Sequence, residues 1–143
     1  MKKLIILLTV LSMSFISCKK DKAISSIKTE NITLENATVI MAGNLSFPSK
    51  MSTGAGSVKI YRQSNGEYVL ALEQMNLNVG TSLVVYFSTS ATASSSSIKI
   101  YSVKHLYGNA FHILPNNIDF TAFKYLIIQA ELSEEIIASA ELK

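Results

Sequence analysis

The chain has 143 residues, a formal charge of +3, one cysteine and no tryptophan. This length supports one domain of ordinary size, and an apolar content of 48% excludes a disordered or collagen-like chain. A single cysteine excludes an internal disulfide and any zinc or iron–sulfur site that needs several cysteines. The positive net charge makes nucleic acid and acidic membranes the first partners to consider.

The first 17 residues have the organisation of a secretory signal peptide. Lys2 and Lys3 give a positive start, and residues 4–16 are apolar except for one Thr and two Ser. Thirteen helical residues span about 20 Å, which is too short for a comfortable membrane crossing. The segment ends in the residues Phe-Ile-Ser-Cys (15–18), which resemble a bacterial lipobox, with Phe15 where an aliphatic residue is usual.

Cys18, the only cysteine, stands where a lipobox requires one, and this favours a lipid anchor over an ordinary secretory signal. We therefore expect residues 1–17 to be removed and Cys18 to become the lipidated N-terminus. A diacylated and N-acylated cysteine buries enough acyl chain for stable membrane attachment. The predicted location is the bacterial cell envelope. The outer membrane is favoured because Lys19 follows the cysteine where inner-membrane retention signals often carry Asp. Its periplasmic or surface side is left open.

Residues 18–36 are expected to form the lipidated N-terminus and a flexible tether. Four lysines stand against three acidic residues between Lys19 and Asn36, and no apolar period is sustained. The alternative is a first edge strand built on the apolar residues of this segment, which are Ile24, Ile27, Ile32 and Leu34. Residues 37–143 then form the domain.

Period-two apolar patterning and β-branched residues predict an all-β domain over residues 37–143. The Asn65–Gly66 pair between two alternating runs predicts a hairpin. The expected strands cover residues 38–47, 56–62, 67–73, 83–88, 98–104, 110–114 and 123–131. Residues 133–143 fit either a helix or a strand, and the β content elsewhere favours a strand. Seven or eight short strands indicate a single antiparallel β-sandwich or partly open barrel.

Two features could carry recognition. Residues 89–97 are a Ser/Ala/Thr-rich segment, expected to be a flexible surface loop, with a recognition loop or a glycosylated patch as alternatives. Tyr61, Tyr86 and Tyr101 alternate with aliphatic residues in their predicted strands. Cross-strand packing is the simpler interpretation of these tyrosines. The alternative is a shared outward face that binds a glycan or a protein.

We expect no catalysis, no metal and no cofactor. His105 and His112 are seven residues apart on two predicted strands, and convergent metal ligands are not indicated. The sequence contains neither the Cys-x-x-Cys-His motif of haem attachment nor a Gly-x-Ser-x-Gly elbow. Glu134 and Glu135 are expected to lie in a solvated turn.

Four segments of the domain resemble short motifs that occur in the same order in one known protein family. Residues 54–60 (GAGSVKI) look like a Gly-x-Val-x-Ile strand, and residues 83–88 (LVVYFS) are similar to Asp-Leu-x-Val-Tyr-Leu-Ser. Residues 108–115 (GNAFHILP) resemble Gly-x-x-x-Tyr-x-Leu-Pro, with His112 in place of Tyr, and residues 140–142 resemble a closing Ala-x-Leu. From about Ala42 to Leu142 the chain thus resembles the DM-thirteen domain, a secreted β-sandwich family.

The resemblance implies a role related to electron transfer, because the family occurs beside DOMON and cytochrome-b-type domains. That role rests largely on a late cysteine, and this chain has Leu-Ile-Ile-Gln-Ala at residues 126–130 instead. Neither Gln nor Ala can replace a thiol in redox chemistry. The sequence therefore predicts a non-catalytic binding or accessory module with an unknown protein or glycan partner. The alternative is an electron-transfer accessory or haem-binding domain.

Removal of the signal peptide changes the charge. The mature chain keeps 11 basic against 10 acidic side chains, and residues 37–143 carry seven of each. A neutral domain removes the electrostatic reason to expect nucleic acid as a partner.

Overall fold

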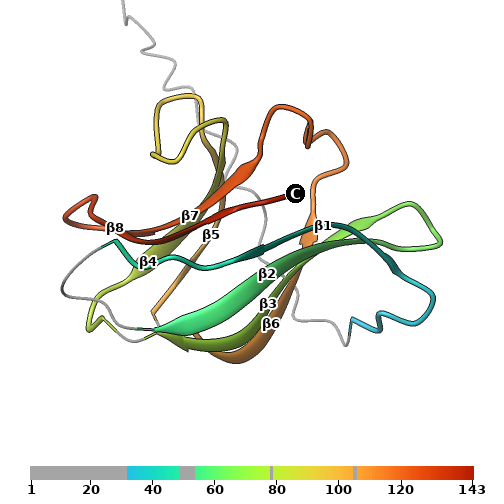
Figure 1. Ribbon diagram of the computed structural model, residues 1–143, viewed down its shortest axis with the longest axis horizontal. Coiled ribbons are helices and arrows are strands. Elements are labelled where there is room, and N and C mark those ends of the chain that lie inside the picture. Colours follow the sequence, from blue (N-terminus) through green and yellow to red (C-terminus); the bar gives the residue numbers. More distant parts are fainter. Residues whose placement is uncertain (1–31, 49–53, 78, 105) are drawn as a thin grey trace, which may run out of the picture.

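The computed structural model describes residues 32–48, 54–77, 79–104 and 106–143 (Figure 1). These residues contain eight strands and no helix, so none of them forms a helix that could span a membrane. The strands are β1 (Thr38–Asn44), β2 (Ala55–Arg62), β3 (Tyr68–Leu77), β4 (Leu83–Ser88), β5 (Ile98–Val103), β6 (Leu106–Leu114), β7 (Tyr125–Ala130) and β8 (Ile136–Glu141).

The strands form two four-stranded antiparallel sheets. Sheet A has the order β1-β2-β3-β6, and sheet B has the order β5-β4-β7-β8. Figure 1 shows β2, β3 and β6 in the lower layer and β7 and β8 in the upper one. The core lies between the sheets. Its residues alternate with oppositely directed ones in β2 (Val58 and Ile60) and in β4 (Leu83, Val85 and Phe87). On the other side of sheet B, Val84 and Ile127 are buried as well. The predicted antiparallel β-sandwich is confirmed.

One pair of sheet edges is joined by hydrogen bonds. Ser46 and Ser139 exchange backbone hydrogen bonds of 2.8 and 2.9 Å, and Ala42 and Lys143 exchange two of 3.0 Å. Gly43 lies at this seam, where a Cβ atom would clash with the backbone oxygen of Glu141. At the other pair of edges, β5 is followed after two residues by β6, so the chain itself passes from sheet B to sheet A.

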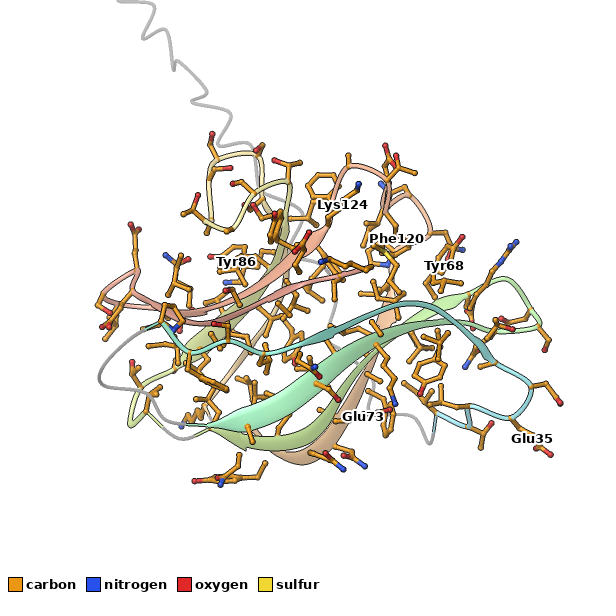
Figure 2. All side chains as sticks on the ribbon, viewed as in Figure 1. Glu35, Tyr68, Glu73, Tyr86, Phe120 and Lys124 are labelled. Atoms are coloured by element: carbon orange, nitrogen blue, oxygen red, sulfur yellow. The ribbon has the colours of Figure 1, made fainter. Side chains whose placement is uncertain are left out.

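Aromatic rings close one end of the core. The Phe120 ring, from the loop before β7, packs edge-on against Tyr68 and Phe87, with ring centroids 5.0 and 5.9 Å apart. Figure 2 shows Phe120 and Tyr68 next to each other at this end. Such edge-to-face pairs contribute about 0.5–1.5 kcal/mol beyond the burial of their area.

The hairpin and the last strand agree with the predictions. Gly66 in the β2–β3 turn has φ 88°, in the left-handed region that glycine tolerates best. Residues 136–141 of the ambiguous last segment are β8, which pairs with β7 and buries Ile137 and Ala138.

β3 is longer than predicted because it contains a bulge. The pairing with β6 passes from Leu72 directly to Met75, which leaves Glu73 and Gln74 as the irregular residues. Gln74 has φ 53°, and its N–H donates to Asn109 Oδ1 at 2.9 Å. The bulge lets Met75 face the core again, so the strand continues where simple alternation predicts its end at Glu73.

The tether region is described only from Ile32. Residues 32–36 form no strand, so the alternative edge strand is wrong for this part of it. Gln63 Nε2 donates to the Thr33 carbonyl oxygen at 3.3 Å, which holds the segment beside the β2–β3 hairpin. Ile24, Ile27 and Cys18 lie outside the described residues.

Candidate functional site

The three tyrosines of the predicted recognition face do not share a face: one lies in the core and the other two lie on the outer faces of different sheets. Tyr101 is 5% exposed and belongs to the core. Tyr61 lies on the outer face of sheet A, where its hydroxyl donates to Glu73 Oε1 at 3.1 Å. Tyr86 lies half-buried on the outer face of sheet B. Figure 2 shows Tyr86 in the upper layer and Glu73 in the lower one. The prediction of a shared face is therefore wrong.

A bulge in β5 explains why Tyr101 points inward. Tyr101 pairs with the core residue Val85, and Lys99 pairs with Tyr86, so Ile100 is the extra residue of the bulge. Paired residues of neighbouring strands point to the same face, and an extra residue shifts everything beyond it to the other face. The alternation Lys-Ile-Tyr in the sequence carries no sign of this shift.

Tyr61 belongs to a charged cluster that braces sheet A. Lys59 Nζ lies 2.6 Å from Glu73 Oε2, and the Tyr61 hydroxyl binds the other carboxylate oxygen. The hydrogen bond to Glu73 raises the pKa of Lys59, and burial together with Glu73 raises the pKa of Tyr61. At neutral pH Lys59 is therefore charged and Tyr61 is neutral, as is usual for both, so the cluster links β2 to β3 and offers no activated acid or base.

Tyr101 and His112 form a stacked pair inside the sandwich. The ring centroids are 3.7 Å apart, and the ring planes are inclined by 26°. The Tyr101 hydroxyl and both His112 nitrogens are buried and have no hydrogen-bond partner among the described residues. Burial raises the pKa of Tyr101 and lowers the pKa of His112 to about 4. His112 is thus a neutral imidazole at neutral pH.

This pair does not resemble a metal site. His112 stacks against a tyrosine ring, and His105 lies outside the described residues. Within the described ranges, no three His, Cys, Asp or Glu side chains converge as metal ligands do.

The candidate site is a pocket of about 300 Å³ on the outer face of sheet B. Three separate parts of the chain meet there: strand β4, the loop before β5 and the β7–β8 hairpin. The lining residues are Tyr86, Ala93, Ser94, Ser95, Gln129 and Glu134. Tyr86 is thus the one tyrosine of the predicted recognition face that lines this pocket.

The Ser/Ala/Thr-rich loop forms one wall of the pocket and is held by its own hydrogen bonds. Ser88 Oγ donates to the Thr92 carbonyl oxygen at 2.8 Å. The Ser97 N–H donates to the Ser94 carbonyl oxygen and the Ser94 N–H donates to Ser97 Oγ, each at 2.9 Å. These bonds give the loop a defined conformation, whereas the sequence predicts a flexible one.

The β7–β8 hairpin forms the opposite wall. Gln129 Nε2 donates to the Glu134 carbonyl oxygen, so the Gln129 amide oxygen remains available as an acceptor. Glu134 has φ 56°, an uncommon conformation for a residue other than glycine, and its side chain is exposed. Sequence reasoning missed both residues as site residues because nothing local marks a turn that lies beside a distant loop.

Two further hollows occur among the described residues. One of about 260 Å³ lies between residues 32–35 and the β2–β3 hairpin, where the described part of the chain begins. The other, of about 600 Å³, lies over the β1–β8 seam beside Phe120 and Lys124. Its rim carries the Lys143–Glu141 ion pair of 3.3 Å. Neither combines an aromatic ring with hydroxyl, amide and carboxylate groups as the Tyr86 pocket does.

Comparisons of this chain with protein-family models, with curated proteins and with solved structures each gave no match. The resemblance to the DM-thirteen family therefore rests on the sequence segments quoted above.

Proposed function

We propose that this protein is a lipid-anchored component of the bacterial cell envelope that presents a small, non-catalytic β-sandwich as a binding module. The pocket at Tyr86 is the observation that carries the binding role. The position of Cys18 at the end of an apolar leader carries the anchoring role.

The composition of the pocket supports recognition more than catalysis. Its volume of about 300 Å³ is at the lower end of the range of about 300–1,000 Å³ usual for small-molecule sites. Glu134 is the one carboxylate among its lining residues. General acid–base or nucleophilic catalysis needs a second group within hydrogen-bond reach of the first, and the remaining lining residues supply only hydroxyl, amide and methyl groups.

The anchor leaves the pocket free to meet a partner near the membrane. Ile32 follows Cys18 by 14 residues. A fully extended chain spans at most about 3.3–3.6 Å per residue, so this segment reaches no farther than about 50 Å. The domain is electrically neutral, with seven basic and seven acidic side chains, so the lipid rather than surface charge holds it at the membrane.

Intact-mass measurement of protein extracted from the membranes of producing cells tests the anchor. The expected mass corresponds to a chain that begins at Cys18 and carries acyl groups. A Cys18→Ser variant should lose the acyl mass, whereas a Ser17→Ala variant should keep it because a small residue still precedes the cysteine. A processed wild-type chain without acyl groups contradicts the anchoring role.

The electron-transfer alternative is implied by the family resemblance. An absorption spectrum of protein purified from its native envelope separates it from a binding module. We expect no visible band. A Soret or metal-centred band would overturn the binding-module proposal in favour of a redox role.

A further inference from the structure

The aromatic member of the pocket is suited to contact with a sugar ring. Tyr86 is half-buried on a central strand of sheet B, and its backbone pairs with both β5 and β7. The face of a tyrosine ring carries partial negative charge, and the C–H groups of a pyranose carry partial positive charge, so the two pack favourably. A ring fixed on a strand loses little conformational freedom when it makes this contact.

The polar members of the pocket match hydroxyl groups. The Ser94 hydroxyl already shares a 2.8 Å hydrogen bond with the Ser96 hydroxyl. The Ser95 hydroxyl can donate and accept, whereas the Gln129 amide oxygen and the Glu134 carboxylate only accept. No described residue pairs with the Glu134 carboxylate. Sugar hydroxyls can donate and accept, so they can satisfy this mixed set without an added charge.

The charge of the pocket excludes other classes of small ligand. Glu134 is the one charged residue that lines it, so phosphates and other anions meet repulsion. Lys99, which pairs with Tyr86 across the strands, has its own carboxylate partner in Glu131 at 3.9 Å. A cation gains little from one exposed carboxylate, since exposed ion pairs contribute about 0–1 kcal/mol.

From this combination we infer that the Tyr86 pocket binds a neutral carbohydrate through one or two sugar rings. The inference rests on the proposed function, because it names the ligand class of the same binding module. The hydrogen-bonded loop of residues 89–97 and the β7–β8 hairpin form the two walls of the sugar site, and Tyr86 provides its stacking surface.

Saturation-transfer NMR on the acylated protein tests this inference, in a zwitterionic detergent that contains no sugar. The probes are four trisaccharides: maltotriose, cellotriose, β-1,4-mannotriose and chitotriose. At least one should receive saturation from the protein. Tyr86→Ala should weaken its affinity by about tenfold, whereas Tyr86→Phe keeps the ring and should stay within about threefold of the wild type.

Two further variants complete the design. Ser95→Phe changes an exposed loop residue and should block the pocket without removing a core side chain, so it tests the site even where Tyr86→Ala is unstable. Tyr107→Ala removes an exposed tyrosine from sheet A and should leave binding unchanged.

The inference is overturned if none of the four trisaccharides receives saturation, or if binding is unchanged in both Tyr86→Ala and Ser95→Phe. The measurement is independent of the anchor. Acylated protein that ignores all four probes rejects the sugar site and leaves the proposed function standing. Protein that binds a sugar but carries no acyl group supports the sugar site and rejects the lipid anchor of the proposed function.

Discussion

Tyr101 and His112 place three polar atoms inside the sandwich without hydrogen-bond partners among the described residues. A buried donor or acceptor without a partner costs about 1–3 kcal/mol, so this pair opposes the stability that its stacked rings provide. The two rings join the edge strands β5 and β6, which belong to different sheets and are not paired with each other among the described residues.

Replacement of Tyr101 by Phe should therefore not destabilise the protein. The variant keeps the stacked ring and removes the unpaired hydroxyl, so the free energy of unfolding should stay equal or rise by up to about 2 kcal/mol. Tyr61→Phe is the matched control, because its hydroxyl binds Glu73, and it should lose about 1 kcal/mol. Urea unfolding measures both, and a loss for Tyr101→Phe as large as that for Tyr61→Phe contradicts this account.

His112 makes stability depend on pH. Its pKa is lowered from 6.5 to about 4 in the folded state, so the unfolded chain takes up the proton first as the pH falls. The free energy of unfolding should therefore be fully retained above pH 6.5 and should fall between pH 6.5 and about 4. With allowance for the partial exposure of the ring, the loss should be about 2 kcal/mol.

His112→Phe removes the titrating group and should flatten this part of the pH profile relative to the wild type. It should also raise stability near neutral pH, because two unpartnered nitrogens leave the core. Denaturant unfolding at pH 4.5, 5.5 and 7 gives the comparison. Equal pH slopes for the variant and the wild type would mean that His112 does not carry the effect.

Among the elements, the presence of most strands could be predicted, whereas the bulges within them could not. Alternation of Val58 and Ile60 with polar residues placed β2, and the apolar run of residues 126–128 placed β7 as a strand covered on both faces. The bulges at Gln74 and Ile100 each shift the phase by one residue. Their positions depend on pairing with strands that are distant in sequence, which no local pattern reports.

In the candidate site, too, local features could be predicted from the sequence and contacts between distant segments could not. Tyr86 and the loop of residues 89–97 were named from the sequence, because an aromatic on a strand and a serine-rich loop are local features. Gln129 and Glu134 reach the pocket only because β7 pairs with β4, a contact between residues about 40 positions apart.

The seam between β1 and β8 depends on Gly43. A methyl group there would meet the backbone oxygen of Glu141, and backbone cannot move aside as a flexible side chain can. Gly43→Ala should lower the free energy of unfolding by about 1–3 kcal/mol. It should also speed hydrogen exchange at the amides of Ala42 and Lys143, which bond across the seam.

Gly66→Asn is the matched control for a glycine outside the seam. Nothing lies within 4 Å of the position of its Cβ, so only the positive φ of 88° strains the variant, and asparagine tolerates such a φ better than most residues. The loss of stability should therefore be smaller than that of Gly43→Ala. If Gly43→Ala is as stable as Gly66→Asn and keeps its amide protection, then the seam does not depend on glycine.

At the scale of the whole molecule, the N-terminal leader and the β-sandwich have different proposed roles. The leader and Cys18 supply the predicted route to the envelope, whereas the neutral sandwich supplies the surface that carries the pocket. The pocket lies on the outer face of sheet B, away from the core. The loop before β5 and the β7–β8 hairpin form its walls. With the proposed lipid anchor at Cys18, the domain would present this surface to a partner in the envelope.

Site-directed photo-crosslinking in intact cells tests this account most directly. A photoreactive phenylalanine at Leu132, which is 89% exposed at the tip of the β7–β8 hairpin, lies beside the pocket without lining it. The control position is Tyr107, exposed on sheet A. We predict an adduct from position 132 that depends on Cys18 and is lost in Tyr86→Ala, and none from position 107. Equal adducts from both positions, or an adduct at 132 that survives Cys18→Ser and Tyr86→Ala, would contradict the account.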